Sequence, residues 1–161
     1  MFPRLTTAAI ALVLCALPGA GQASTPYFAR RAELRKALPN AVVVLFGRAE
    51  SDSDDLRSGF YQEPNFYYLT GWNQPGAVML IEPAGEMLFL PAKDPEAEKW
   101  TGPKASAQDK NAAAITGFEH VMSLPAFESE LARVMRQYPR LYALHSTKLE
   151  RRAPLPEISD A

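Results

Sequence analysis

Cysteine and histidine, which proteins use as nucleophiles and metal ligands, are scarce in this sequence. Its 161 residues include one cysteine, Cys15, and two histidines, His120 and His145. A single cysteine excludes an intramolecular disulfide. Neither histidine has a second histidine four residues away, as helical zinc sites do. His120 falls on a short predicted strand and His145 at the end of another, so we expect both to have structural roles.

Several motifs of enzymes and nucleic-acid-binding proteins are also missing. The sequence has no Gly-x-Ser-x-Gly elbow, no phosphate-binding loop and no dinucleotide-binding fingerprint. Its charge is nearly balanced, with 17 Lys and Arg residues against 18 Asp and Glu residues. This balance gives no electrostatic basis for binding nucleic acid or an anionic membrane surface.

The first 23 residues have the pattern of an export signal. Arg4 precedes the apolar run Ala8–Leu17, which is too short to span a bilayer. Small residues, Gly21 and Ala23, occupy the two positions that a signal peptidase reads. We therefore expect residues 1–23 to be a signal peptide and the protein to be exported, either periplasmic or secreted. The alternatives are a short N-terminal anchor and a buried helix.

Cleavage after Ala23 would remove Cys15 and so exclude thiolate chemistry from the mature chain. It would also remove Arg4, which leaves 16 Lys and Arg residues against 18 Asp and Glu residues. Taking 23 residues from 161 leaves 138, enough for one domain with one core. The expected domain is residues 24–150, followed by a proline-containing linker at 151–161.

Hydrophobic periodicity predicts alternating helices and strands in this domain. The apolar run Ala41–Phe46 indicates a strand buried on both faces. Ala77–Ile81 and Met87–Leu90 indicate a hairpin, because the turn residues Pro83–Glu86 join them. The other predicted elements are helices at Tyr27–Leu38, Asp94–Trp100, Ser106–Ala114 and Ser123–Tyr138, and strands at Phe118–Met122 and Leu141–Leu144. The pattern predicts a single α/β domain, a mixed β-sheet flanked by helices.

Two of these helices are predicted to be amphipathic. On the first, the residues expected to face the core are Phe28, Ala32, Leu34 and Leu38. Its residues expected to be solvated are Arg30, Arg31, Arg35 and Lys36. On the last helix, the expected apolar face is Phe127, Leu131, Val134 and Met135, with Ser123 as the N-cap.

The segment Phe60–Gly71, with the sequence FYQEPNFYYLTG, is the most distinctive in the chain. We expect a polar turn and then a short aromatic strand, Phe66–Leu69, that ends at Thr70-Gly71. Alternation would place Phe66 and Tyr68 on one face of that strand. A base-stacking role for these aromatic residues lacks a basic surround, which favours packing in the core.

The acidic cluster 51–55 is compared with a calcium-binding loop. Counting from Asp52 places Glu63 at position twelve, as an EF-hand requires, but position six is Arg57 instead of glycine. No helices are predicted to flank the cluster. A solvated surface loop over residues 47–59 is therefore the preferred interpretation.

Several separated motifs resemble the N-terminal domain of Xaa-Pro aminopeptidases (aminopeptidase P), in the creatinase/prolidase group. The matching positions are Asp55, Phe60, Gln62, Asn65, Phe66, Tyr67, Tyr68, Thr70 and Gly71. Two further segments resemble the family pattern, residues 73–78 and residues 97–104. Two positions differ from the family pattern, which has an arginine at each. Here they are Tyr61 and Lys104. Tyr61 cannot supply the planar donor fork of arginine.

The resemblance implies a domain without catalytic residues that packs beside a pita-bread catalytic domain. In such enzymes the catalytic domain binds two divalent metals, usually manganese, through two Asp, one His and two Glu, and cleaves the bond preceding a proline. None of these ligands can be placed on this sequence. The chain is therefore expected to be a catalytically inactive fragment of an exported metallopeptidase, contributing to dimer or tetramer formation and to active-site access. Peptide substrate would be bound only through the parent enzyme.

The resemblance also implies two site residues. Trp100 would form part of a substrate-binding wall, in its own or a neighbouring subunit, and Asp55 would face the mouth of the active site. The alternatives are a buried helix anchor for Trp100 and a loop cap for Asp55.

Three other functions remain as alternatives. The first is a free-standing exported binding or regulatory module with this fold and no peptidase activity. The second is an unrelated exported ligand-binding domain with Trp100 in a deep pocket. The third is a creatinase-like amidinohydrolase parent.

Overall fold

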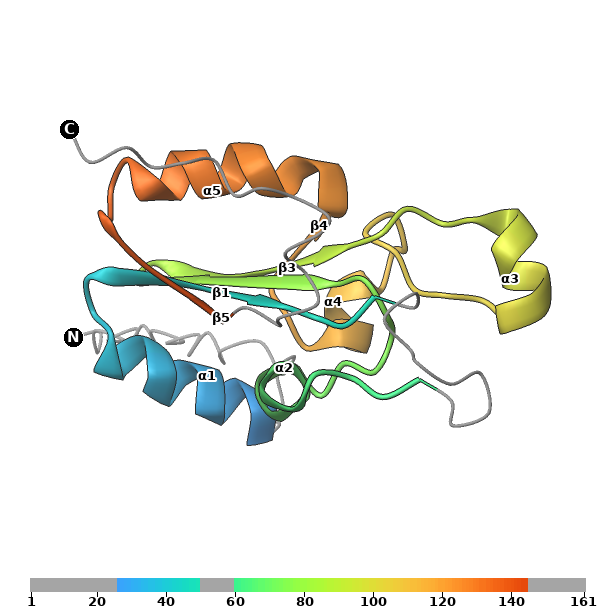
Figure 1. Cartoon of the computed structure of the whole chain (residues 1–161), viewed down its shortest axis with the longest axis horizontal. Coiled ribbons are helices and arrows are strands. Elements are labelled where there is room, and N and C mark those ends of the chain that lie inside the picture. Colours follow the sequence, from blue (N-terminus) through green and yellow to red (C-terminus); the bar gives the residue numbers. More distant parts are fainter. Residues whose placement is uncertain (1–25, 50–59, 145–161) are drawn as a thin grey trace, which may run out of the picture.

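A five-stranded mixed sheet forms the centre of the molecule (Figure 1). The computed structural model describes residues 26–49 and 60–144. The strands are β1 (Ala41–Phe46), β2 (Val78–Glu82), β3 (Gly85–Leu90), β4 (His120–Ser123) and β5 (Arg140–Leu144), in the spatial order β4-β3-β2-β1-β5. β2 is antiparallel to β1 and β3, whereas β4 is parallel to β3 and β5 is parallel to β1. The predicted single domain with a mixed sheet is confirmed.

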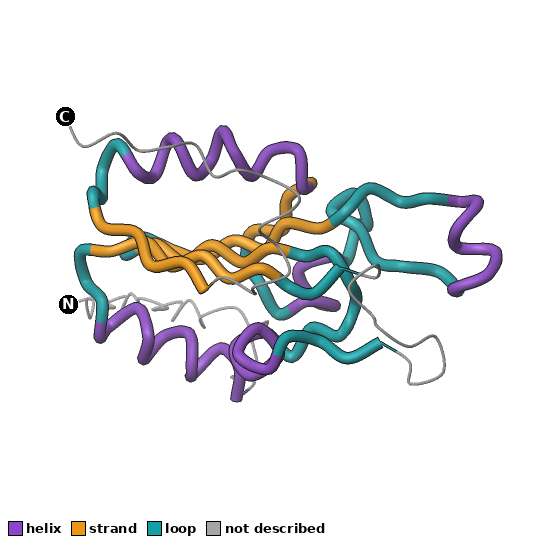
Figure 2. Tube along the Cα trace, viewed as in Figure 1, coloured by secondary structure: helices purple, strands orange, loops and turns teal. Residues whose placement is uncertain are grey.

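Helices cover both faces of the sheet (Figure 2). α1 (Pro26–Ala37) and α2 (Pro64–Thr70) lie on one face, and α5 (Phe127–Met135) lies on the other. The loop excursion between β3 and α4 (Ala112–Thr116) carries α3 (Pro95–Thr101), which projects beyond the ends of the strands. Across the described parts of the chain, no helix has the length and apolar character needed to cross a bilayer.

The apolar run of β1 contributes to two cores, as predicted. Val43 and Leu45 pack in the core beneath α1 and α2, and Val42 and Val44 pack in the core beneath α5. The predicted hairpin is also confirmed, because Glu82 pairs with Gly85 across the turn between β2 and β3. These elements follow directly from local sequence, since a β-branched run suits a strand buried on both faces.

The predicted aromatic strand at Phe66–Leu69 is wrong, because this segment is helix α2. The Glu63 carboxylate caps the helix by accepting a 2.6 Å hydrogen bond from the Phe66 backbone N–H, and Pro64 occupies the first turn. Gly71 ends the helix at φ 67°. Phe66 packs in the core as expected, but Tyr67 and Tyr68 are exposed, so their expected core packing is also wrong.

Arg31 was expected to be solvated, yet its side chain is 1% exposed. Its guanidinium donates hydrogen bonds to the Glu86 carboxylate at 2.7 Å, the Gly117 carbonyl at 2.8 Å and the Leu69 carbonyl at 3.0 Å. The guanidinium carbon also lies 3.9 Å from the centre of the Phe118 ring. One side chain of α1 therefore connects α2, β3 and the end of α4.

Three predicted boundaries also differ from the structure. The helix expected at Ser106–Ala114 is limited to α4, and the strand expected at Phe118–Met122 begins two residues later, at His120. The helix expected at Ser123–Tyr138 starts as a 3₁₀ turn, Leu124–Ala126, and Ser123 makes no side-chain cap. α5 then ends at Met135, with Phe127, Leu131 and Val134 buried as predicted.

The segment 91–105, here named the α3 arm, is fastened at its base by polar contacts. Lys93 donates a 2.7 Å hydrogen bond to Asp109, and Ala105 N–H donates to the Gln74 side-chain oxygen at 3.2 Å. The bond to Lys93, helped by the Ser106 backbone N–H, lowers the pKa of the Asp109 carboxyl. The Asp109 carboxylate in turn raises the pKa of Lys93.

Replacing Arg31 should strongly destabilise the fold. Arg31→Met leaves the Glu86 carboxylate buried without its cation, so we expect a loss of about 3–5 kcal/mol in the free energy of unfolding. Arg31 Nε and Glu86 Oε2 have no partner among the described residues, so Arg31→Met/Glu86→Leu should recover most of this loss. The measurement is urea denaturation.

Lys36→Met is the matched control for this experiment, because Lys36 lies on the same helix with its side chain 80% exposed. It should change stability by less than about 0.5 kcal/mol. An Arg31→Met variant as stable as the Lys36→Met variant would contradict the role assigned to the buried pair.

The base of the α3 arm should respond to pH through Asp109. Because its pKa is lowered in the folded state, its contribution to stability is present above the ordinary Asp pKa and is lost as pH falls through the lowered value. Lys93→Met should raise the Asp109 pKa towards the ordinary value of an aspartate, measured by NMR of the carboxyl carbon. Lys99→Met, which removes a contact to Glu96 instead, should leave it unchanged. An Asp109 pKa that is insensitive to Lys93→Met would rule out this pairing.

Candidate functional site

Trp100 lies on α3 and is 90% exposed. The helix is well defined locally, because the Asp94 carboxylate accepts hydrogen bonds from the backbone N–H groups of Glu96 and Ala97. Gly102 ends it at φ 80°, where its N–H donates to the Glu98 carbonyl. Trp100 is therefore not a buried anchor of its helix, and the alternative interpretation given above for this residue is wrong.

None of the α3 residues is buried, so its position depends on the two ends of the α3 arm rather than on packing. Figure 1 shows the helix well away from the two core layers. A tryptophan is among the side chains that gain most from burial. Its near-complete exposure on a projecting helix indicates a contact surface.

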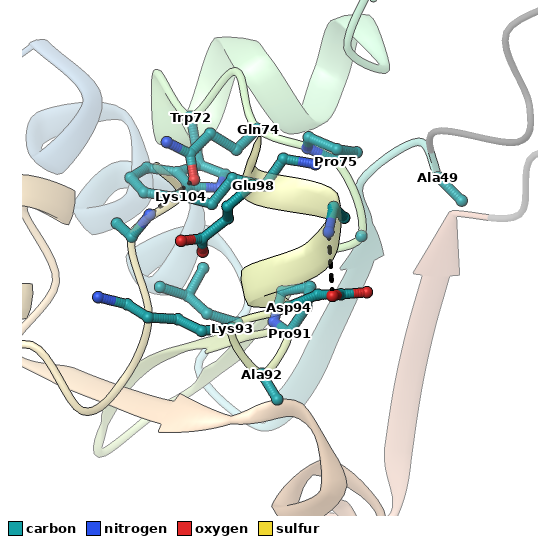
Figure 3. A pocket seen from close by; sticks show the side chains of 14 residues that line it. Ala49, Trp72, Gln74, Pro75, Pro91, Ala92, Lys93, Asp94, Glu98 and Lys104 are labelled. Atoms are coloured by element: carbon teal, nitrogen blue, oxygen red, sulfur yellow. Dashed lines mark hydrogen bonds between the residues drawn. The ribbon is translucent and has the colours of Figure 1, made fainter. Parts of the chain in front are cut away.

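A cavity of about 250 Å³ lies at the base of the α3 arm. β1 and β3 run in the same direction, and the cavity lies at their carboxyl ends, next to the start of β2. The carboxyl ends of strands are common places for binding sites in α/β sheets. The lining residues that carry polar groups on their side chains are Trp72, Gln74, Lys93, Asp94, Glu98 and Lys104 (Figure 3).

Two polar atoms of this cavity are buried without a hydrogen-bond partner among the described residues. They are the indole N–H of Trp72 and one carboxylate oxygen of Glu98, Oε1. Figure 3 shows the Glu98 carboxylate lying between Trp72 and Lys93. The cavity thus presents one donor and one acceptor that are otherwise unsatisfied.

Gln62 holds the chain segments behind the cavity together. Its side-chain oxygen accepts hydrogen bonds from the backbone N–H groups of Arg48, at 2.6 Å, and Glu63, at 3.0 Å. Its amide nitrogen donates to the Gln74 carbonyl at 3.0 Å. The sequence placed Gln62 only in a polar turn, although it is one of the motif positions. Tyr61 beside it is 65% exposed.

Of Asp55 and the two histidines, His120 alone lies among the described residues, and it does not line this cavity. His120 is exposed on β4. Asp55, His145, the acidic cluster 51–55 and residues 1–23 lie outside the described residues. Within the described ranges 26–49 and 60–144, no group of His, Cys, Asp and Glu side chains could hold a metal ion. What the cavity offers a ligand is hydrogen bonding, through the Trp72 indole N–H and the Glu98 carboxylate oxygen.

Residues that matter at this site were missed in the sequence because their roles depend on tertiary contacts. Trp72 lies next to the motif segment 73–78, and Glu98 lies within the segment 97–104. Their place in the motifs was the only sequence signal that could have indicated them. Nothing in local sequence shows that the Trp72 indole and the Glu98 carboxylate lie in the same cavity.

Comparisons with known proteins agree with this architecture. The family model described as "Aminopeptidase P, N-terminal domain" matches residues 27–142. Human Xaa-Pro aminopeptidase 3 is 28% identical over 113 residues, which cover 65% of this chain and 22% of that protein. Intermediate cleaving peptidase 55 of Saccharomyces cerevisiae is 35% identical over 91 residues, which cover 51% of this chain and 18% of that protein.

Solved structures show the same fold. An aminopeptidase P from Bacillus anthracis matches with a TM-score of 0.61 and 27% identity, over 77% of this chain and 33% of that chain. Zinc-substituted Escherichia coli aminopeptidase P in complex with product matches with a TM-score of 0.60 and 22% identity, over 76% of this chain and 28% of that chain. The chain spans about a fifth of the length of the curated relatives it matches. The chain belongs to the family of aminopeptidase P N-terminal domains.

Proposed function

We propose that this chain is the non-catalytic N-terminal domain of an Xaa-Pro aminopeptidase-like metallopeptidase. Two findings support this, the family match over residues 27–142 and the similarity to proteins named Xaa-Pro aminopeptidases. The complete enzyme would release an N-terminal residue that precedes proline. Residues 1–23 would direct it out of the cytoplasm.

Hydrolysis belongs to a partner catalytic domain in this proposal. Two divalent metals, manganese in our proposal, would polarise the scissile peptide bond and activate water there. The described residues of this chain provide no comparable cluster. Their part would be to pack beside the catalytic domain, to contribute to a dimer or tetramer and to restrict access to the cleft.

The observation that carries this proposal is Trp100, 90% exposed on the α3 arm. The arm is closed at its base by the 2.7 Å contact between Lys93 and Asp109, which limits where α3 can lie. A large aromatic side chain held on such a projection can form one wall of a peptide-binding cleft, in the same subunit or a neighbouring one. Burial of its surface in the assembled enzyme would offset the cost of exposing it here.

A domain exchange tests this role. Residues 24–150 would replace the N-terminal domain of the Bacillus anthracis aminopeptidase P, and hydrolysis of an Xaa-Pro peptide would be measured. If Trp100 contacts substrate, Trp100→Ala should raise KM about tenfold, which corresponds to about 1.4 kcal/mol. The matched control is Lys99→Ala, because Lys99 is an exposed neighbour on α3.

Two results would contradict the proposal. If the exchanged enzyme is no more active than the catalytic domain alone, the chain does not pair with such a domain. If Trp100→Ala and Lys99→Ala have the same KM, the arm plays no part in access to the cleft.

A further inference from the structure

Trp72 presents a hydrogen-bond donor to the cavity at the base of the α3 arm. Its side chain is part of the core beneath α1 and α2 and is 7% exposed. Its backbone N–H is satisfied by the Thr70 hydroxyl at 3.0 Å, but its indole N–H has no acceptor among the described residues. A buried donor without a partner destabilises the molecule, and an acceptor on a bound ligand would remove that cost.

Glu98 presents an acceptor to the same cavity. Its Oε1 is buried and receives no hydrogen bond from the described residues. The nearby Lys93 ammonium is held 2.7 Å from Asp109, and the Lys99 ammonium is held by Glu96. A buried carboxylate oxygen is stabilised most by a charged N–H donor.

The charges and size of the cavity restrict what can fill it. Its charged lining residues are two lysines, Lys93 and Lys104, and two acids, Asp94 and Glu98. The Asp94 carboxylate is already used to cap α3. Lining charges that sum to zero favour a ligand with no net charge. The volume, about 250 Å³, lies below the range of about 300–1,000 Å³ that is usual for pockets of drug-sized ligands, which favours a small molecule.

We propose that this cavity binds a small zwitterion of the α-amino acid class. The ammonium group of the ligand would donate to Glu98 Oε1, and its neighbouring carboxylate oxygen would accept from the Trp72 indole N–H. Both buried groups are then satisfied by one molecule of zero net charge. The inference rests on the cavity alone and does not depend on the proposed peptidase function.

The two tryptophans allow a direct test in the full 161-residue chain. The sequence contains only Trp72 and Trp100, so a ¹⁵N-labelled sample gives two indole N–H signals, which Trp100→Phe assigns. Glycine is the probe, added to about 50 mM, which detects binding with a millimolar Kd. The Trp72 signal should shift and saturate, while the signal of the exposed Trp100 should not move.

Variants and an altered probe identify the contacts. Glu98→Gln keeps the size of the side chain but removes its charge, and should weaken binding about tenfold. Glu96→Gln is the matched control, because Glu96 lies on the same helix with its side chain 82% exposed, and it should bind glycine as the unaltered chain does. N,N,N-trimethylglycine has no N–H to donate and should not shift the Trp72 signal.

Three results would overturn the inference. The first is a Trp72 signal that does not shift up to about 50 mM glycine, or that moves only in parallel with Trp100. The second is equal affinity in Glu98→Gln and Glu96→Gln. The third is equal binding of glycine and its trimethylated form.

Discussion

The buried ion pair between Arg31 and Glu86 is the contact on which one half of this fold depends. A guanidinium removed from water must have acceptors, and Arg31 finds them in β3 and in the carbonyls of Leu69 and Gly117. Neither α1 nor α2 can shift without leaving one of these groups unpaired. The layer of helices above this face of the sheet is therefore positioned by polar geometry as well as by apolar packing.

The opposite face is built differently. Its core is formed by aliphatic and aromatic side chains from the sheet and α5, including the edge-to-face pair of Phe89 and Phe127, with ring centres 5.3 Å apart. The α3 arm meets the core only at its base, where Ala105 packs beneath α1 and α2 and polar contacts fasten the two ends. Such an arm can present Trp100 and enclose the cavity next to Trp72, which suits a part of the molecule that meets a ligand or another domain.

Sequence reasoning succeeded where local pattern decides structure and failed where a tertiary contact does. The β1 run, the β2–β3 hairpin and the apolar face of α5 follow from period and turn residues. Arg31 stands three residues from both Phe28 and Leu34, so helical spacing places it on the buried face of α1. It was predicted to be solvated because its side chain is charged. Its acceptor Glu86 lies 55 residues away. The α2 helix was missed because Glu63 and Pro64 were read as a turn instead of a helix start.

Whether the domain works beside a dimetal catalytic domain is tested most directly by the DNA that follows the Ala161 codon in frame. The proposed function predicts that the reading frame continues into a segment that supplies two Asp, one His and two Glu as metal ligands. A stop codon with no such segment nearby would contradict the peptidase role. The same fold would then act as a free-standing binding module.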